Sequence, residues 1–366
     1  MADHDLDAPP TTTKDRDGLL VAQSATFTNM FEWPDADYKA KEDATFARMK
    51  SPIPAPDDHF GWRSWEQEKM RDGPKPVLAK RYRTAVKVNR TNVSVTYDGD
   101  NTYRILVHNP EPYPGEATSL RPAVLWFHGG GWAHGSPEMD AQRADYVASE
   151  IRGVVFNVDY RLIPEIAWPK NHNDVYHSIG WAIDNAKDYN IDPSRLAMWG
   201  QSAGAHLAAG AALRDAVEHK PSRLRHVNLT VPVTHDIRNE PYPLNQNAEA
   251  EMAKIPEVLF RQFLNVLRDM TGSDEPSTDP YFSPLRSEIP SHHPSTYISV
   301  GGLDRLRDRG IAYALHLRQH GVDTQLEIVP GVPHAYTGEN DTYAAKQYWR
   351  DQVKVLNMAL RFDWEH

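Results

Sequence analysis

The sequence predicts an α/β fold in which a mostly parallel central sheet is flanked by helices. Two continuous apolar runs, residues 123–127 and 154–158, are typical of strands that are buried on both faces. Between them, residues 140–151 have the spacing of apolar side chains expected for a helix. This alternation of strand and helix along the chain indicates parallel strands joined by helical crossovers.

The remaining elements follow in order. Residues 93–97 and 103–108 alternate between apolar and polar side chains on either side of the turn-forming segment 98–101, which predicts an antiparallel pair. A helix is expected from about residue 175 to residues 189–190. Further strands are expected at 196–199, 229–233, 296–300 and 325–329. The core of the fold is therefore assigned to residues 86–236 and 276–366.

Two segments do not follow this alternation, and both are expected to belong to a mainly helical cap. Within residues 1–85, the stretches 25–49 and 60–70 carry aromatic side chains, and each is followed by a Pro-rich break, at 51–56 and at 73–76. Two interpretations of this segment remain: a lid over a pocket, or an arm that braces the core. Residues 237–275 contain an expected helix at 258–267 and lie between two strands, where a cap insertion is favoured over an ordinary crossover helix.

Composition excludes several kinds of function. The formal net charge of −10 argues against a surface for nucleic acid or anionic membrane. The chain has no cysteine, so disulfides, thiolate metal sites and cysteine nucleophiles are excluded. Neither a secretory signal nor an apolar run of membrane-spanning length is found, and a cytoplasmic protein is expected. We expect no metal and no cofactor.

The segment 200–204, Gly-Gln-Ser-Ala-Gly, has the pattern G-x-S-x-G between an apolar run and a helical stretch of small residues. In this pattern the serine lies at a sharp turn from strand to helix, where neighbours larger than glycine would collide. The turn exposes the hydroxyl and places the next N–H beside a developing oxyanion. Ser202 is therefore the candidate nucleophile, and Ala203 a candidate oxyanion donor.

The segment 128–132, His-Gly-Gly-Gly-Trp, directly follows the strand at 123–127. Three glycines leave the main-chain N–H groups open to an oxyanion. A phosphate-binding loop is disfavoured because no Lys-Ser/Thr follows and the G-x-G-x-x-G spacing is absent. His128 is expected to brace the loop rather than act as a base, and Trp132 and His134 to line the mouth of the pocket.

A candidate acid and a candidate base follow two later strands. Asp304 comes after the strand at 296–300, and His334 comes after the strand at 325–329. Both are expected at the carboxyl edge of the sheet that also holds Ser202, and the order Ser, Asp, His is that of the α/β-hydrolase triad. Asp308 is a rival acid but is expected to begin a helix. Four rival histidines are assigned to a polar loop or to a solvated helix face: His292, His293, His316 and His320.

Four segments in this order resemble the hormone-sensitive-lipase family of α/β hydrolases: 128–132, 159–165, 200–204 and 301–310. The resemblance covers roughly residues 120–345. It implies the α/β-hydrolase fold, carboxylic-ester hydrolysis without a cofactor, and a cap built from the N-terminal segment plus an insertion. It also implies that the N–H groups of Gly130, Gly131 and Ala203 form the oxyanion hole.

Three positions depart from the family pattern. Gln201 stands where an acidic residue is usual, which alters the support behind the nucleophile. The acid motif reads Asp304-Arg305-Leu306 instead of Asp-Pro-Leu, a change that bears on the path of its loop. Ala-Tyr follows His334 where Gly-Phe is common. None of these departures removes a catalytic group.

The sequence thus predicts a serine carboxylic-ester hydrolase that forms an acyl-enzyme on a small to medium, apolar or aromatic ester. In this interpretation Ser202 attacks, His334 takes its proton, and Asp304 orients the imidazole. Two alternatives remain. The same triad in a dry site would serve an acyltransferase, a lactonase or a lactone-forming enzyme, and a non-catalytic small-molecule receptor is disfavoured because His334 is present. A homodimer remains open.

Overall fold

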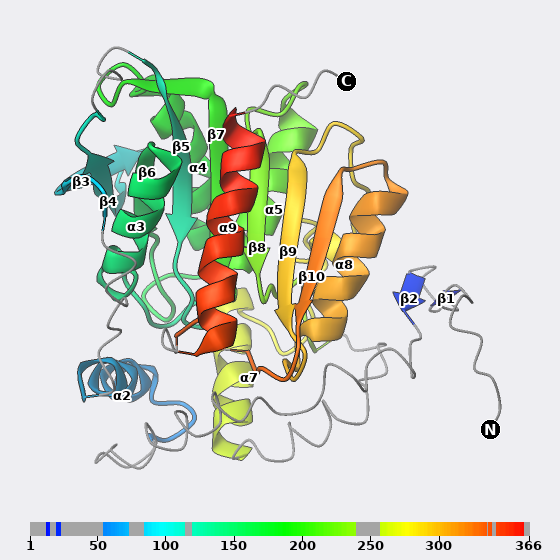
Figure 1. Cartoon of the computed structure of the whole chain (residues 1–366). Coiled ribbons are helices and arrows are strands. Elements are labelled where there is room, and N and C mark those ends of the chain that lie inside the picture. Colours follow the sequence, from blue (N-terminus) through cyan, green and yellow to red (C-terminus); the bar gives the residue numbers. More distant parts are fainter. Residues whose placement is uncertain are drawn as a thin grey trace.

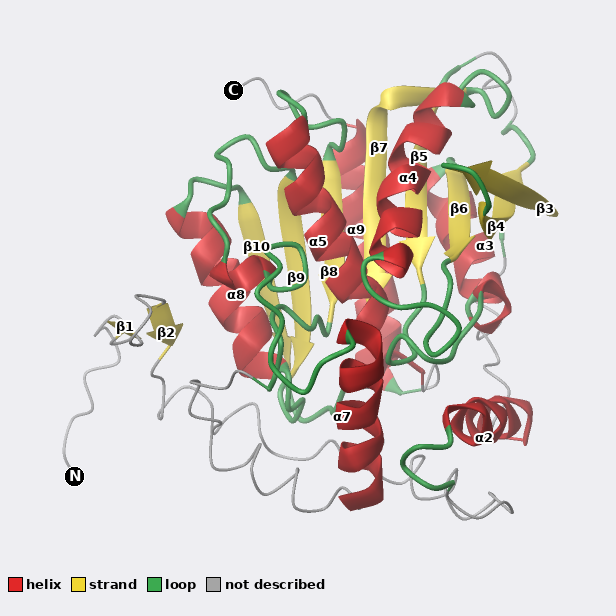
Figure 2. Cartoon of the chain, turned by 180° about the vertical axis from the view of Figure 1, so that it is seen from behind, coloured by secondary structure: helices red, strands yellow, loops and turns green. Residues whose placement is uncertain are grey.

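The computed structural model describes residues 12–14, 20–22, 54–72, 84–113, 119–238, 257–334, 336–338 and 342–361. Its centre is an eight-stranded sheet in the order β10-β9-β8-β7-β5-β6-β4-β3. Helices α3 and α9 cover one face of this sheet, and α4, α5 and α8 cover the other (Figures 1 and 2). The predicted α/β class with a mostly parallel sheet and flanking helices is confirmed.

The strands divide into an antiparallel edge and a parallel centre. The hairpin of β3 (Val88–Tyr97) and β4 (Asn101–Pro110) joins the sheet through an antiparallel pairing of β4 with β6. All other pairings in this sheet are parallel, between β5 (Arg121–Phe127), β6 (Val154–Asp159), β7 (Ile191–Gln201), β8 (His226–Thr230), β9 (Ser295–Gly301) and β10 (Thr324–Val329). A separate antiparallel pair consists of β1 (Thr12–Lys14) and β2 (Leu20–Ala22).

The helices connect these strands or lie beyond the sheet. The described α-helices are α2 (His59–Asp72), α3 (Ala141–Ile151), α4 (Lys170–Asp184), α5 (Ala203–Glu218), α7 (Glu257–Thr271), α8 (Arg307–Gln319) and α9 (Tyr343–Arg361). Three short 3₁₀ turns are η3 (Pro137–Met139), η4 (Pro284–Arg286) and η5 (Tyr336–Gly338). None of the described helices combines the length and the apolarity needed to cross a membrane.

Several expected boundaries were wrong: α4, β7 and β3 each begin about five residues earlier than expected, and two elements end earlier. Helix α4 ends at Asp184 rather than near residues 189–190, and the Asn185 side chain donates a hydrogen bond to the Trp181 carbonyl at 2.8 Å where the helix stops. Strand β8 ends at Thr230 rather than at residue 233. Val231 has a φ of +44°, which no strand residue adopts, and its successor is a proline that has no N–H for a ladder bond.

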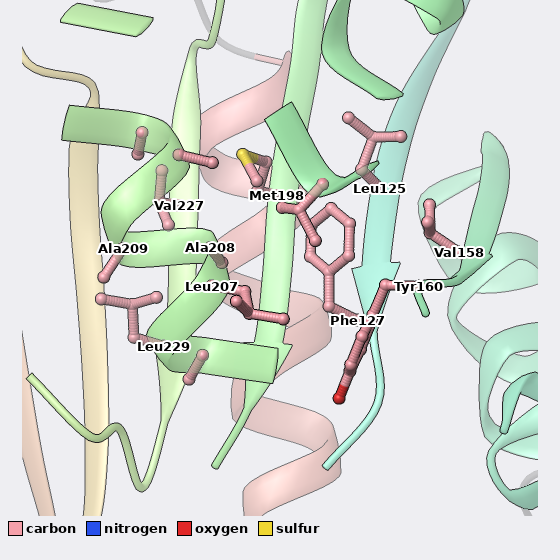
Figure 3. Packing of buried hydrophobic residues seen from close by; sticks show 14 of the residues in the cluster. Leu125, Phe127, Val158, Tyr160, Met198, Leu207, Ala208, Ala209, Val227 and Leu229 are labelled. Atoms are coloured by element: carbon pink, nitrogen blue, oxygen red, sulfur yellow. The ribbon is translucent and has the colours of Figure 1, made fainter. Parts of the chain in front are cut away.

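The core has two layers, one on each face of the sheet. Alternate residues of β5 point to opposite faces: Leu125 and Phe127 lie on the face that α4 and α5 cover (Figure 3), whereas Val124 and Trp126 lie on the face that α3 and α9 cover. All four side chains are buried. This explains why the strand reads as a continuous apolar run, because both of its faces are covered.

Helices α2 and α7 lie beyond the carboxyl ends of the parallel strands, apart from the two layers that flank the sheet (Figures 1 and 2). Helix α7 includes the helix expected at 258–267, and α2 lies within the N-terminal segment. The whole aromatic stretch at 25–49 and the part of the proposed insertion at 239–256 lie outside the described residues. The division into core and cap remains a prediction.

Candidate active site at the carboxyl edge of the sheet

Three side chains predicted from separate parts of the sequence meet at this edge. Ser202 Oγ lies 2.7 Å from His334 Nε2, and His334 Nδ1 lies 2.9 Å from Asp304 Oδ2. The Asp304 side chain is fully buried, and the His334 side chain is 29% exposed. Because a carboxylate accepts hydrogen bonds, the Nδ1 proton points toward Asp304 and the Nε2 lone pair toward the serine hydroxyl. The arrangement suits proton transfer from Ser202 to His334.

The backbone holds Ser202 in a conformation that few residues adopt. Its φ and ψ are +53° and −115°, at the junction of β7 and α5. Its N–H donates to the Thr230 carbonyl at 2.9 Å, which ties the turn to the neighbouring strand. A Cβ at Gly200 would lie 2.3 Å from the Gly204 carbonyl oxygen, so a side chain there is excluded. The G-x-S-x-G spacing therefore reflects a sharp turn with no room beside the serine.

The glycine loop after β5 lies against this turn. A Cβ at Gly129 would stand 3.6 Å from the Ser202 Cβ. Gly130 has a φ of +125°, and a Cβ there would meet the His134 carbonyl oxygen at 2.0 Å. The loop closes through hydrogen bonds from the N–H groups of Ala133 and His134 to the Gly130 carbonyl. No hydrogen bond within the described part of the chain uses the N–H of Gly130 or Gly131, so both remain available to a ligand.

Hydrogen bonds fix the acid loop and the histidine loop to each other. Asp304 Oδ1 accepts the Leu306 N–H at 2.8 Å, which leaves Oδ2 for His334. The Gly302 N–H donates to the Val329 carbonyl at 2.7 Å, and the Leu303 N–H donates to the Val332 carbonyl at 2.9 Å. Because β9 and β10 are adjacent parallel strands, their loops leave the sheet side by side.

The competing candidates lie elsewhere. His128 is buried, its Nδ1 is 2.7 Å from the Gly129 carbonyl, and its ring stacks on Tyr160 at 4.3 Å between centroids. Burial lowers the pKa of His128, so the ring stays neutral and braces the loop as expected. Asp308 lies in the first turn of α8 and accepts a hydrogen bond from Arg307 Nε at 2.9 Å. It therefore begins a helix, as expected.

The other histidines are more enclosed than expected. His316 and His320 are half-buried rather than solvated, because their rings contact each other at 4.5 Å and His316 Nε2 lies 2.7 Å from the Ser287 carbonyl. His293 is also buried, and burial lowers its pKa to about 4. His292 Nε2 lies 2.8 Å from the Ala216 carbonyl. Each of these rings contacts main-chain carbonyls away from Ser202.

The prediction that Trp132 lines the mouth of the pocket was wrong. Trp132 has a φ of +61° and its side chain is fully buried, with its ring 5.5 Å from that of Phe263 on α7. Its Nε1–H donates to His206 Nδ1 at 3.1 Å. The turn folds the indole back into the protein, where α7 covers it. His134 is half-buried beside the glycines, since a Cβ at Gly131 would lie 4.0 Å from His134 Nε2.

Sequence reasoning missed His206, one turn after the nucleophile on α5. Its Nδ1 accepts from Trp132, and its Nε2 lies 2.7 Å from the Phe282 carbonyl, which fixes the proton on Nε2. Burial lowers the pKa of His206 to about 4, so the ring is neutral at neutral pH. The histidine thus links helix α5 to Trp132, the residue after the glycine loop. His206 lies four residues after Ser202, so both side chains lie on one face of the helix. This spacing is the feature of the sequence that could have indicated His206.

Gln201, the departure behind the nucleophile, has a defined contact. Its Nε2 donates a hydrogen bond to the Thr337 hydroxyl in η5, a few residues beyond His334. The amide thus connects the serine turn with the histidine loop through a neutral hydrogen bond. A carboxylate could only accept at this position, whereas the glutamine amide also donates.

Polar side chains of α2 contact the backbone just after the glycine loop. Sequence reasoning also missed these contacts. Arg63 Nε donates to the Ala133 carbonyl at 2.9 Å, and its two terminal nitrogens pair with the Glu165 carboxylate at 2.6 and 3.0 Å. His59 Nε2 lies 2.7 Å from Asp269 Oδ2, which links α2 to α7. These partners are separated by tens to hundreds of residues, so no local pattern indicates them.

Comparisons with known proteins agree with this geometry. The profile of the alpha/beta hydrolase fold family matches residues 124–338. The ethyl acetate hydrolase of Pseudomonas putida is 31% identical over 245 residues, which are 66% of this chain and 73% of the relative. The arylesterase of Saccharolobus solfataricus is 32% identical over 219 residues, which are 60% of this chain and 69% of the relative.

A solved structure of a bacterial heroin esterase is also similar, with a TM-score of 0.75 and 27% identity over 92% of this chain and 100% of that chain. The similarity therefore extends from the sequence motifs to nearly the whole fold. The chain belongs to the alpha/beta hydrolase fold family and is a carboxylesterase-type hydrolase.

Proposed function

We propose that this hydrolase cleaves a carboxylic ester through an acyl-enzyme formed on Ser202. The observation that carries the proposal is the continuous hydrogen-bonded series from Ser202 Oγ through His334 to the buried Asp304 carboxylate. A serine hydroxyl is a weak nucleophile unless a positioned base removes its proton. Here the base is within hydrogen-bonding distance, and its tautomer is held by an acceptor on the far side.

In the acylation step, Ser202 Oγ attacks the ester carbonyl carbon while His334 Nε2 takes the hydroxyl proton. Asp304 stabilises the imidazolium cation that forms. The N–H groups of Gly130, Gly131 and Ala203 donate hydrogen bonds to the tetrahedral oxyanion. Two observations support this role: the two glycine N–H groups make no hydrogen bond within the described residues, and Gly129, which precedes them, lies against Ser202. His334 then protonates the leaving alcohol as the carbonyl re-forms.

In the deacylation step, His334 removes a proton from water, whose oxygen attacks the acyl carbonyl carbon. The bond from this carbon to Ser202 Oγ then breaks, His334 returns the proton to Oγ, and the acid is released. The same donors stabilise the second oxyanion. A short or aromatic ester is the substrate that we propose, since similar proteins include an ethyl acetate hydrolase and an arylesterase. The half-buried ring of Phe263, which packs on Trp132 beside the glycine loop, agrees with an apolar substrate. No observation favours acyl transfer or lactone chemistry over hydrolysis.

The test compares p-nitrophenyl acetate, butyrate and octanoate near pH 8, with pre-steady-state detection of p-nitrophenol. Wild-type protein is expected to turn over with a preference for the short chains, and Ser202→Ala to lose turnover and burst together. A burst without turnover would contradict hydrolysis and indicate that water does not resolve the acyl-enzyme. Turnover retained by Ser202→Ala would overturn the proposed nucleophile.

A further inference from the structure

Arg305, the residue after the proposed acid, lies where helix α7 covers the catalytic edge. Its guanidinium carbon is 5.6 Å from the centroid of the Phe263 ring. The same ring lies 5.5 Å from Trp132, which directly follows the glycine loop. Phe263 thus spans the distance between the acid loop and the oxyanion loop. Arg305 reaches the same ring from the side of the acid loop.

The Arg305 guanidinium has no anionic partner in the described part of the chain, where it makes neither a hydrogen bond nor an ion pair. Within these residues, the guanidinium instead makes a cation–π contact with the Phe263 ring. The Asp304 carboxylate is next to it in the sequence, but its two oxygens already accept from the Leu306 N–H and from His334. Other arginines in this part of the molecule are paired. Arg63 binds Glu165, and Arg307 binds Asp308.

An enclosed cation without a carboxylate is energetically unfavourable, because burial removes water that would solvate it. Burial lowers the pKa of Arg305, the charge of Asp304 opposes this shift, and the nearby Arg309 adds to it. Two guanidinium groups therefore raise the local positive potential. A bound carboxylate would compensate the Arg305 cation for the water that burial removes. A guanidinium donates two parallel, charge-assisted hydrogen bonds to a carboxylate.

We propose that Arg305 selects an ester substrate that carries a carboxylate in addition to the ester group. The carboxylate belongs either to the acyl part, as in a half-ester of a dicarboxylic acid, or to the alcohol part, as in an acylated hydroxybenzoate. Arg305 binds this group while the half-buried Phe263 ring contacts the apolar remainder. The inference rests on the proposed ester hydrolysis at Ser202, and it adds the charge of the substrate.

The first experiment compares kcat/KM for two matched pairs of esters. Mono-p-nitrophenyl glutarate and p-nitrophenyl pentanoate differ by a carboxylate in the acyl part. The pair 4-acetoxybenzoate and 4-acetoxybenzamide differs by a carboxylate in the alcohol part. Wild-type protein is expected to prefer the anionic member of one pair, and the preferred pair identifies the side of the ester that Arg305 contacts.

The variant Arg305→Gln is expected to lower kcat/KM for that anionic ester by about 10- to 100-fold, mainly through KM, and to change the neutral ester by less than about twofold. Arg305→Lys should restore part of the preference, since it keeps the charge without the paired donors. Arg90→Gln removes one positive charge from the Arg90–Asp145 pair, far from Ser202, and serves as the control for net charge. An anionic-to-neutral ratio that is the same in wild type and Arg305→Gln would overturn the inference.

A second readout separates this inference from the proposed chemistry. Equilibrium binding of the same intact esters is measured by calorimetry on Ser202→Ala, with and without Arg305→Gln. If no ester is turned over but the anionic ester binds and Arg305→Gln abolishes binding, ester hydrolysis is wrong and the anion site stands. If neutral esters are hydrolysed while the anionic esters bind no better than neutral ones, hydrolysis stands and the anion site is wrong.

Discussion

The catalytic edge of the sheet and the two helices that lie beyond it are held in place by different means. At the edge, backbone geometry fixes the side chains: Ser202 has a positive φ, and a Cβ at Gly130 would collide with the His134 carbonyl. Both constraints come from residues within a few positions of the functional group. Few residue types satisfy these constraints at the affected positions, so the motifs can be recognised from the sequence.

The covering helices are positioned instead by side-chain contacts between distant parts of the chain. Arg63 of α2 bonds to the Ala133 carbonyl and to Glu165, and His59 of α2 contacts Asp269 of α7. Each of these contacts is individually modest and partly exposed. We infer from this comparison that substitutions at the catalytic edge change activity strongly. Substitutions in α2 and α7 change their contacts and the choice of substrate instead.

The largest effect is expected for substitutions at the catalytic edge. Ser202→Ala and His334→Ala should each reduce kcat for p-nitrophenyl butyrate by about 10⁴-fold or more, and the double variant should lose hardly more than either alone. The reason is that each group acts only through the other. Single-turnover rates of the three proteins measure this, and losses that multiply in the double variant would contradict a shared function.

A smaller effect is expected at the oxyanion loop. Gly130→Ala places a Cβ 2.0 Å from the His134 carbonyl oxygen and must displace the loop, so kcat should fall by about 10²- to 10³-fold. Gly131→Ala is the matched control, because its Cβ meets only His134 Nε2 at 4.0 Å. Its φ of +53° costs about 1 kcal/mol, which predicts a loss below about tenfold. Equal losses in the two variants would show that the collision is not the cause.

The core should also limit stability in acid. His226 is fully buried in β8, where its ring nitrogens lie 2.7 Å from Ser295 Oγ and 2.7 Å from Asn228 Oδ1. Burial lowers its pKa to about 4, below the value of an exposed histidine, so the unfolded chain binds the proton more readily. Its contribution to stability is complete above about pH 6.5 and is lost as the pH falls toward 4, at about 1.4 kcal/mol per pH unit.

Urea unfolding at pH 7, 6 and 5 measures this slope. His226→Asn is expected to be less stable than wild type at pH 7 but to lose stability less steeply on acidification. His172, His206 and His293 have pKa values lowered to about 4 by the same cause, so a substantial slope should persist in the variant. An unchanged slope in His226→Asn would show that this ring takes up its proton without unfolding.

The smallest effect is expected for a substitution in the covering helix α2. Arg63→Met removes the contacts of α2 with Ala133, Ile163 and Glu165, and KM for p-nitrophenyl butyrate should rise by about 3- to 10-fold with little change in kcat. Arg90→Met removes the remote surface pair with Asp145 and should leave both constants unchanged. If Arg63→Met lowers kcat as strongly as Gly130→Ala, the helix positions the reacting groups and the distinction between the two regions fails.

The comparison also explains which expectations succeeded. The order of strands and helices was predictable because burial on both faces gives β5 its apolar run, and because α3 shows the regular spacing of a packed helix. Ser202, Asp304 and His334 could be expected at one place because each follows a buried strand, and carboxyl ends of parallel strands meet at one edge. The structure brings these three side chains within hydrogen-bonding distance.

The misplaced residues have one feature in common. Trp132 was expected at the pocket mouth, but it turns inward to bond with His206, and that contact spans 74 positions in the sequence. The enclosure of His316 likewise depends on the Ser287 carbonyl 29 positions away. No periodicity or motif contains such information, because the partner is chosen by packing of elements rather than by neighbours along the chain.

By itself, the sequence determined the α/β class and the turn at Ser202, and it singled out Asp304 and His334, the two residues that the structure brings together with that serine. These depend on local sterics and on strand burial, which act over a few residues. Only the tertiary structure decided that the Arg305 guanidinium faces Phe263, with no carboxylate bonded to it among the described residues, and that Trp132 is covered by α7. The physical reason is that ion pairing, burial and the pKa values that follow from them depend on groups brought together by the fold.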